Sequence, residues 1–185
     1  MQRRIVEPAD LSGSALDELK SWLGVSRANE DALLTDLLHS CLAVCEAFTG
    51  QLPIRQSIEE RLPARAGSYR LRSRPVTALL SAELVSQDQT RSAIDPSRFE
   101  FAVDAHGCGT FELQDDVEEP VIALTVSAGR GASWDEIPAP LKQGIIRLCA
   151  HYYRDRDRTG GEKVASAPPA SVSALWRPFQ IMRLA

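Results

Sequence analysis

The sequence predicts an α+β protein, and three features of its pattern carry the prediction. Apolar residues recur at helical spacing in two regions, residues 14–48 and 140–157. Between them, several stretches of residues 54–129 alternate apolar and polar side chains, as strands do. The helical and strand-like stretches are separate along the chain instead of alternating regularly. We therefore expect a bundle of about three main helices, an inserted antiparallel β-rich segment and an extended C-terminal tail.

The first expected helix covers residues 14–23. Leu16, Leu19 and Leu23 fall on one of its faces, which is the spacing a helix needs to bury one side. Ser14 can cap its first turn, and the glycine after Leu23 can end it.

A second, longer helix is expected over residues 30–48. Asn29 precedes it and can cap its first turn, while Gly50 and Pro53 follow it and prevent its continuation. Its apolar stripe has three-and-four spacing and consists of Leu34, Leu37, Leu38, Cys41, Leu42, Cys45 and Phe48.

The middle of the chain, about residues 54–129, is expected to form a small antiparallel sheet of about five strands, given usual strand lengths. The clearest hairpin has strands at residues 98–103 and 110–113, joined by the glycine-containing turn at 104–109. A further strand is expected at residues 121–126. Pro75 and Pro120 fit best at strand starts or edges.

The third expected helix covers residues 140–157, with Pro140 in its first turn. Gly144 lies inside it at some cost to helix stability, which suggests that another backbone packs closely there. The charged residues at its end are candidates for a contact between subunits, and the alternative is a solvated helix end. They are Arg154, Asp155, Arg156, Asp157 and Arg158.

Residues 159–185 are expected to be a flexible tail that binds a partner, appended to a domain of residues 1–158. Gly160 and Gly161 suit a hinge, and Pro168 and Pro169 suit a spacer. The expected contact residues are Leu175, Trp176, Arg177, Pro178, Phe179, Ile181 and Met182. Aromatic, Met and Arg side chains dominate interface energies, which favours this reading over a tail that folds back on its own domain.

Composition excludes several classes of protein. The chain has 185 residues, 44% of them apolar and 25% charged, and a net charge of −4. These values are typical of a globular domain and not of a dedicated nucleic-acid binder, which usually carries a basic excess. No signal-peptide core is apparent, and no stretch approaches the roughly 20 apolar residues of a membrane span. We expect a soluble protein of the reducing cytoplasm.

The sequence predicts no enzyme, no metal site and no cofactor. No Cys-x-x-Cys pair, nucleophile elbow, P-loop or dinucleotide-binding glycine pattern is present. The carboxylates of Asp115, Asp116, Glu118 and Glu119 are expected to form an acidic loop between strands. A cysteine-dependent enzyme built on Cys108 or Cys149 stays open as a weaker alternative.

Seven segments, in this order and spacing, resemble a known family. They are residues 19–25, 30–34, 46–50, 74–76, 127–129, 137–156 and the Leu-Trp-Arg-Pro-Phe sequence at 175–179. Together they resemble the head–tail connector (adaptor) proteins of long-tailed bacteriophages and of phage-like gene transfer agents. The resemblance covers roughly residues 15–158, and the β-rich middle of this chain is long for the family.

The resemblance implies a structural role in virion assembly. Such adaptors form a homo-oligomeric ring, typically of twelve copies, at the head–tail interface of the particle. Their C-terminal segments bind the portal protein, their other face receives the stopper or tail-completion protein, and DNA passes through the central channel without specific binding. The resemblance implies assembly in the bacterial cytoplasm and no membrane contact. The alternative is a non-viral bacterial protein-interaction module whose C-terminal peptide binds a partner.

Overall fold

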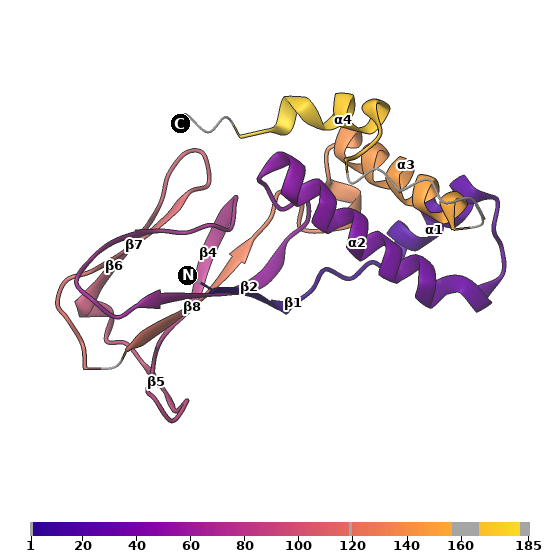
Figure 1. Ribbon diagram of the computed structural model, residues 1–185. Coiled ribbons are helices and arrows are strands. Elements are labelled where there is room, and N and C mark those ends of the chain that lie inside the picture. The colour runs from indigo at the N-terminus through magenta and orange to yellow at the C-terminus, as the bar shows by residue number, and fades with distance from the viewer. Residues whose placement is uncertain (1, 119, 157–166, 182–185) are drawn as a thin grey trace. The chain divides into compact units, whose positions relative to one another are not determined.

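The computed structural model describes residues 2–118, 120–156 and 167–181 and has the expected α+β composition (Figure 1). Its chain divides into two compact units. The β unit comprises Met1–Ala9 and Arg55–Gly129, and the helical unit comprises Asp10–Ile54 and Arg130–Ala185. The expected division was instead between residues 1–158 and a tail at 159–185. The expected hinge at Gly160 and Gly161 lies outside the described residues.

The helical unit contains the three expected helices and one that the sequence analysis missed. They are α1 (Ser14–Leu23), α2 (Asp31–Thr49), α3 (Ala139–Asp155) and the short α4 (Ala170–Trp176). Three 3₁₀ turns accompany them: η1 (Ala28–Glu30), η3 (Trp134–Glu136) and η4 (Arg177–Phe179). The core of the unit includes Leu16, Leu19, Leu34, Leu38, Ile145 and Leu148.

The helix ends agree with the sequence, but the expected N-terminal caps are wrong. Gly24 and Gly50 adopt left-handed conformations (φ 71° and 73°) and donate their N–H groups back into α1 and α2. Such positions favour glycine because it has no Cβ. Ser14 is already the first residue of α1, and Asn29 lies within η1, so neither side chain caps a helix.

By length and composition, one helical stretch among the described residues, Ala28–Thr49, could cross a membrane, contrary to the sequence expectation. The core helix of a soluble protein passes the same test. Helix α2 buries Leu34, Leu38 and Cys41 within the helical unit, although only 33% of its apolar window is buried. The stretch is therefore weak support for a membrane location.

The β unit contains two antiparallel sheets where one was expected. The first has the strand order β1-β2-β8-β4-β5, and the second has the order β3-β7-β6. Their bounds are β1 (Gln2–Glu7), β2 (Gln56–Pro63), β3 (Gly67–Arg70), β4 (Val76–Val85), β5 (Arg91–Ala93), β6 (Phe99–Val103), β7 (Gly109–Leu113) and β8 (Val121–Ala128). The expected β6–β7 hairpin is confirmed, and Pro75 and Pro120 directly precede β4 and β8.

Side chains of β2 alternate between the two faces of the five-stranded sheet. Ile58, Glu60 and Leu62 lie on the buried face, where Glu60 is opposite Leu124 of β8. Glu59 points to the other face, yet only 3% of its surface is exposed. Both carboxylates are therefore shielded from solvent and need partners within the unit.

Candidate partner-binding site

The C-terminal segment, residues 167–181, lies on its own helical unit. Helix α4 packs beside α3, as Figure 1 shows in yellow and orange. Val172 and Trp176 are its buried residues. Because burial of a tryptophan removes a large apolar surface from water, this contact fixes the segment to the unit.

Trp176 fills a space that Gly144 of α3 leaves open. Its side chain is fully buried, and its indole N–H donates to the carbonyl of Leu141 at 3.3 Å. The ring centroids of Trp176 and Phe48 are 5.8 Å apart. A Cβ atom added to Gly144 would lie 2.1 Å from the indole nitrogen. The close neighbour expected at Gly144 is therefore a side chain and not a backbone.

The residues after Trp176 are held at the C-terminal end of α2 by three hydrogen bonds. Ile181 N donates to Thr49 O at 3.0 Å, Gln51 Nε2 donates to Phe179 O at 2.6 Å, and Gln180 Nε2 donates to Phe48 O at 3.1 Å. The guanidinium of Arg130 lies 5.5 Å from the centroid of the Phe179 ring. The same guanidinium donates to Gln51 Oε1 at 2.8 Å. These contacts give η4 a defined place on the unit.

The structure divides the expected tail residues that it describes into three groups by exposure. Trp176 is buried within its own chain, so the expectation that it lacks a place there is wrong, and the alternative of a segment folded back holds for it. Arg177 and Pro178 are exposed, while Leu175, Phe179 and Ile181 are half-buried. Met182 lies outside the described residues. The exposed part of η4 is thus the surface that a partner can reach.

The charged end of α3 makes contacts within its own chain. The Tyr153 hydroxyl donates to Glu30 Oε2 at 2.6 Å, and this hydrogen bond raises the pKa of Tyr153. Arg156 is 3.7 Å from the same carboxylate and 4.5 Å from the Tyr153 ring centroid. His151 Nε2 and Asp155 Oδ2 are 3.2 Å apart.

Two of the five expected subunit-interface residues, Asp155 and Arg156, are therefore already engaged. Arg154 is exposed and lines a groove of about 410 Å³, together with Trp22 and Arg147. Asp157 and Arg158 lie outside the described residues. Trp22 was not among the expected site residues, yet it is 44% exposed. Trp22 does not fall on the apolar face of Leu16, Leu19 and Leu23, and this position in the sequence could have predicted that its side chain is exposed.

An ionic cluster around the buried carboxylate of Glu59 in the β unit was also missed. The Glu59 carboxylate is 2.8 Å from Arg91, 3.0 Å from Arg61 and 3.4 Å from Arg4. Burial alone would raise the pKa of Glu59, but the hydrogen bonds from Arg91 and Arg61 and the nearby positive charges outweigh it. The pKa of Glu59 is consequently lowered, and the carboxylate is ionised at neutral pH.

The geometry gives little support to the alternative of a cysteine-dependent enzyme. Burial raises the pKa of Cys149, which keeps its thiol protonated and unreactive at neutral pH. Cys108 is buried too, with 4% of its surface exposed. Among the residues that the structure describes, no three His, Cys, Asp or Glu side chains gather in a way that could hold a metal ion.

The fold is shared with solved structures of gene transfer agent (GTA) particles. One neighbour is a chain in the neck of an empty GTA particle computed with C6 symmetry, with a TM-score of 0.78 and 22% identity. Others are in the virion of the native GTA particle (TM-score 0.74, 22% identity) and in its neck computed with C12 symmetry (0.74, 21%). Each match covers 100% of this chain and 98% of the other. No family model and no curated protein matches the sequence. The expected resemblance is thus confirmed at the level of the fold.

Proposed function

We propose that this protein is a structural component of the neck of a phage-like particle, where it acts as the head–tail adaptor. The observation that carries the proposal is the shared fold over the whole chain, with the neck chain of the empty GTA particle matched along 98% of its length. A fold alone does not determine function, but here both helical and β units are matched together. The role is one of geometry and assembly, not of catalysis.

The adaptor is proposed to form a homo-oligomeric ring between the portal and the stopper or tail-completion protein. The C6 and C12 symmetries of the neck structures support a ring, and C12 corresponds to twelve copies. DNA passes through the channel of this ring. The net charge of −4 is compatible with passage, because it disfavours strong binding to phosphates.

The portal contact is proposed to use the exposed part of the C-terminal segment. Arg177, Pro178 and the half-buried Phe179 follow directly after the buried Trp176. In this arrangement Trp176 fixes the segment to its own subunit, and η4 presents its side chains outward. An already ordered segment loses less conformational entropy on binding than a flexible one does. Met182 belongs to the same proposed contact.

The proposal is tested by deleting the gene in a host that produces the particle. Loss of an adaptor should leave DNA-filled heads and free tails that do not join, as electron microscopy would record. Expression of the chain from a plasmid should restore complete particles. Normal yields of tailed particles from the deletion strain would contradict the proposal.

A further inference from the structure

Residues 70–74 of the β unit present three arginines beside one another. Arg70 and Arg72 are exposed and Arg74 is half-buried, whereas the intervening Leu71 and Ser73 are each only 1% exposed. The alternation directs the apolar and small side chains inward and the guanidinium groups toward the surface. We refer to Arg70, Arg72 and Arg74 as the arginine segment.

The backbone of the arginine segment is fixed by hydrogen bonds to the rest of the β unit. The fully buried carboxylate of Glu60 accepts the N–H of Arg72 at 3.0 Å and that of Ser73 at 2.7 Å. On either side, Leu71 N donates to Gly109 O and Val76 N donates to Gly107 O, both at 2.8 Å. The segment is therefore ordered before any partner arrives, which lowers the entropic cost of binding.

The guanidinium groups of this segment have few partners in their own chain. Arg70 is 3.1 Å from the sulfur of Cys108 and 3.9 Å from Asp104, with 63% of its side chain exposed. The side chains of Arg72 and Arg74 make no hydrogen bond or ion pair with any of the described residues. Positive charge is thus available at this end of the β unit.

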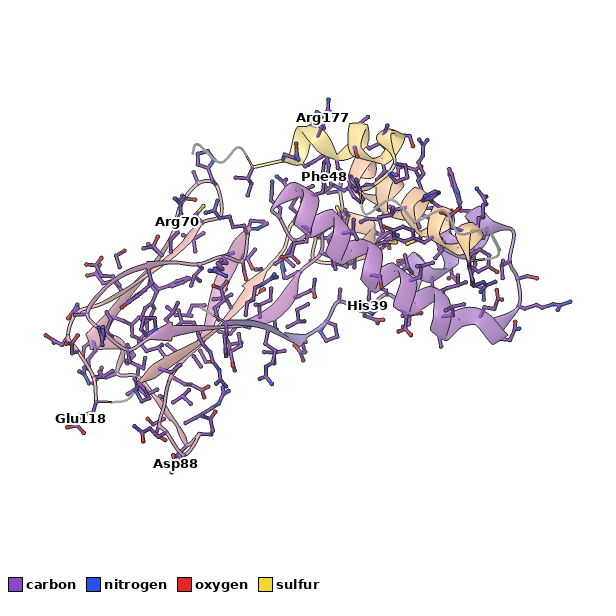
Figure 2. The ribbon with its side chains drawn as sticks, viewed as in Figure 1. His39, Phe48, Arg70, Asp88, Glu118 and Arg177 are labelled. Carbon is purple, nitrogen blue, oxygen red and sulfur yellow. The ribbon has the colours of Figure 1, made fainter. Side chains whose placement is uncertain are left out.

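The opposite end of the β unit is acidic. Strands β3 and β7 connect the two ends, because Arg70 is paired with Thr110 and Gly67 with Leu113. Figure 2 shows Arg70 and Glu118 at opposite ends of the unit. The acidic end consists of Glu100, Glu112, Asp115, Asp116 and Glu118, all exposed. Two positive charges lie near this end. The guanidinium of Arg98 donates to the backbone carbonyl of Asp116 at 3.3 Å, and exposed Arg65 precedes Ala66, whose N–H donates to Asp116 Oδ1 at 2.7 Å.

Two carboxylates of the acidic end face each other directly. Glu100 of β6 and Glu112 of β7 are cross-strand partners, and neither forms an ion pair with a described residue. Like charges in opposite positions destabilise a sheet. A cation supplied from outside the subunit would relieve this repulsion.

We infer that the β unit joins neighbouring copies of this protein, with the arginine segment of one copy against the acidic end of the next. The inference rests on the proposed ring. Head-to-tail contacts that close into a ring need two different, complementary surfaces on every subunit, and the β unit carries both. Complementary charge mainly sets the register and the rate of association. This contact also gives the long β-rich insertion a role.

Charge-reversal variants test the inference in rings assembled from the full chain with its portal. Arg72→Glu with Arg74→Glu should reduce ring formation about tenfold or more, and Glu112→Arg with Glu118→Arg should do the same. The four changes together should recover most of the loss. Arg27→Glu with Arg55→Glu, at exposed arginines elsewhere, is the matched control and should assemble normally.

The results of these experiments distinguish a contact between copies from DNA binding and from failure of the proposed ring. Normal rings from either reversed pair, or no recovery in the combined variant, overturn the inference while the proposed function stands. Intact rings with reduced DNA binding by the Arg72 and Arg74 variant also overturn it and make DNA the ligand. A wild-type chain that forms no ring overturns both proposals. If a reversal lowers the melting temperature, Arg72→Gln with Arg74→Gln replaces it and should give a smaller loss in the same direction.

Discussion

At the scale of single residues, the packing of α4 against α3 depends on both Trp176 and Gly144. The indole occupies the space where any other residue at position 144 would place its Cβ atom. A glycine inside a helix costs about 1 kcal/mol relative to alanine, so its presence in α3 is explained by the tryptophan. The tryptophan in turn loses its place if that space is filled.

Replacing Trp176 with alanine should lower the free energy of unfolding of the protein by about 3–5 kcal/mol, because a fully buried aromatic side chain leaves a cavity. Urea denaturation of the full chain, followed by circular dichroism, measures the change. Phe179→Ala is the control, and its half-buried ring predicts a clearly smaller effect. Equal effects of the two substitutions would contradict the assigned packing.

Gly144→Ala should destabilise the protein by about 1–3 kcal/mol through overpacking, although alanine is the better helix former. Thermal unfolding provides the measurement. Gln143→Ala, one position earlier in α3 and half-buried, should change the melting temperature little. A Gly144→Ala variant that is more stable than the wild type would show that Trp176 does not occupy this space.

Acid should weaken the protein partly through Glu59. The pKa of this carboxylate is lowered in the folded state, so its stabilising contribution is present above its unfolded pKa of about 4.3 and is lost as pH falls through the folded value. Glu59→Gln should therefore be less stable at pH 7 and should lose less stability than the wild type on acidification. Urea denaturation between pH 3 and 7 records both trends.

The exposed residue Glu118 provides the comparison for Glu59. Glu118→Gln should change the free energy of unfolding at pH 7 little, since this exposed carboxylate makes no ion pair with a described residue. If Glu59→Gln and the wild type lose the same stability on acidification, the three arginines do not stabilise the ionised carboxylate of Glu59.

At the scale of elements, the helices with a regular apolar stripe were predictable from sequence. Their signal is local, and α1, α2 and α3 begin and end within a few residues of the expected positions. Strand β1 was not predicted, because all six of its residues are exposed and therefore show no apolar alternation. Helix α4 is only seven residues long and follows two prolines, so its sequence resembled a linker.

The candidate site was predictable only in part. The sequence indicated which C-terminal residues carry apolar and basic side chains, but it could not indicate that Trp176 reaches α3. That contact joins residues far apart in the chain, and single-sequence patterns do not contain it. The same limit applies to two partners of Glu59, because Arg4 belongs to β1 and Arg91 to β5, whereas Arg61 lies on the same strand as Glu59.

Truncation after Gly161 should destabilise the helical unit, because it removes the buried residues Val172 and Trp176. The combined substitution of Arg177→Ala and Pro178→Ala should instead leave the melting temperature nearly unchanged and reduce portal binding. Differential scanning fluorimetry and a portal pull-down distinguish the two effects. Undiminished portal binding by the double variant would exclude these exposed residues from the contact.

At the scale of the whole molecule, the proposed adaptor role divides between the two units. The helical unit carries the C-terminal segment, whose exposed residues are proposed to contact the portal. The β unit carries surfaces of opposite charge at its two ends, which suit contacts between copies. Both units are matched in the neck chains of gene transfer agent particles, so the proposed role concerns the full chain.

The central claim is that copies of this chain assemble as a ring on a portal, and the mass of the complex tests it most directly. Native mass spectrometry of the purified portal, with and without the chain, should show an added mass close to twelve chains, as the C12 neck implies. A complex that gains only one or two chains, or none, would contradict the claim.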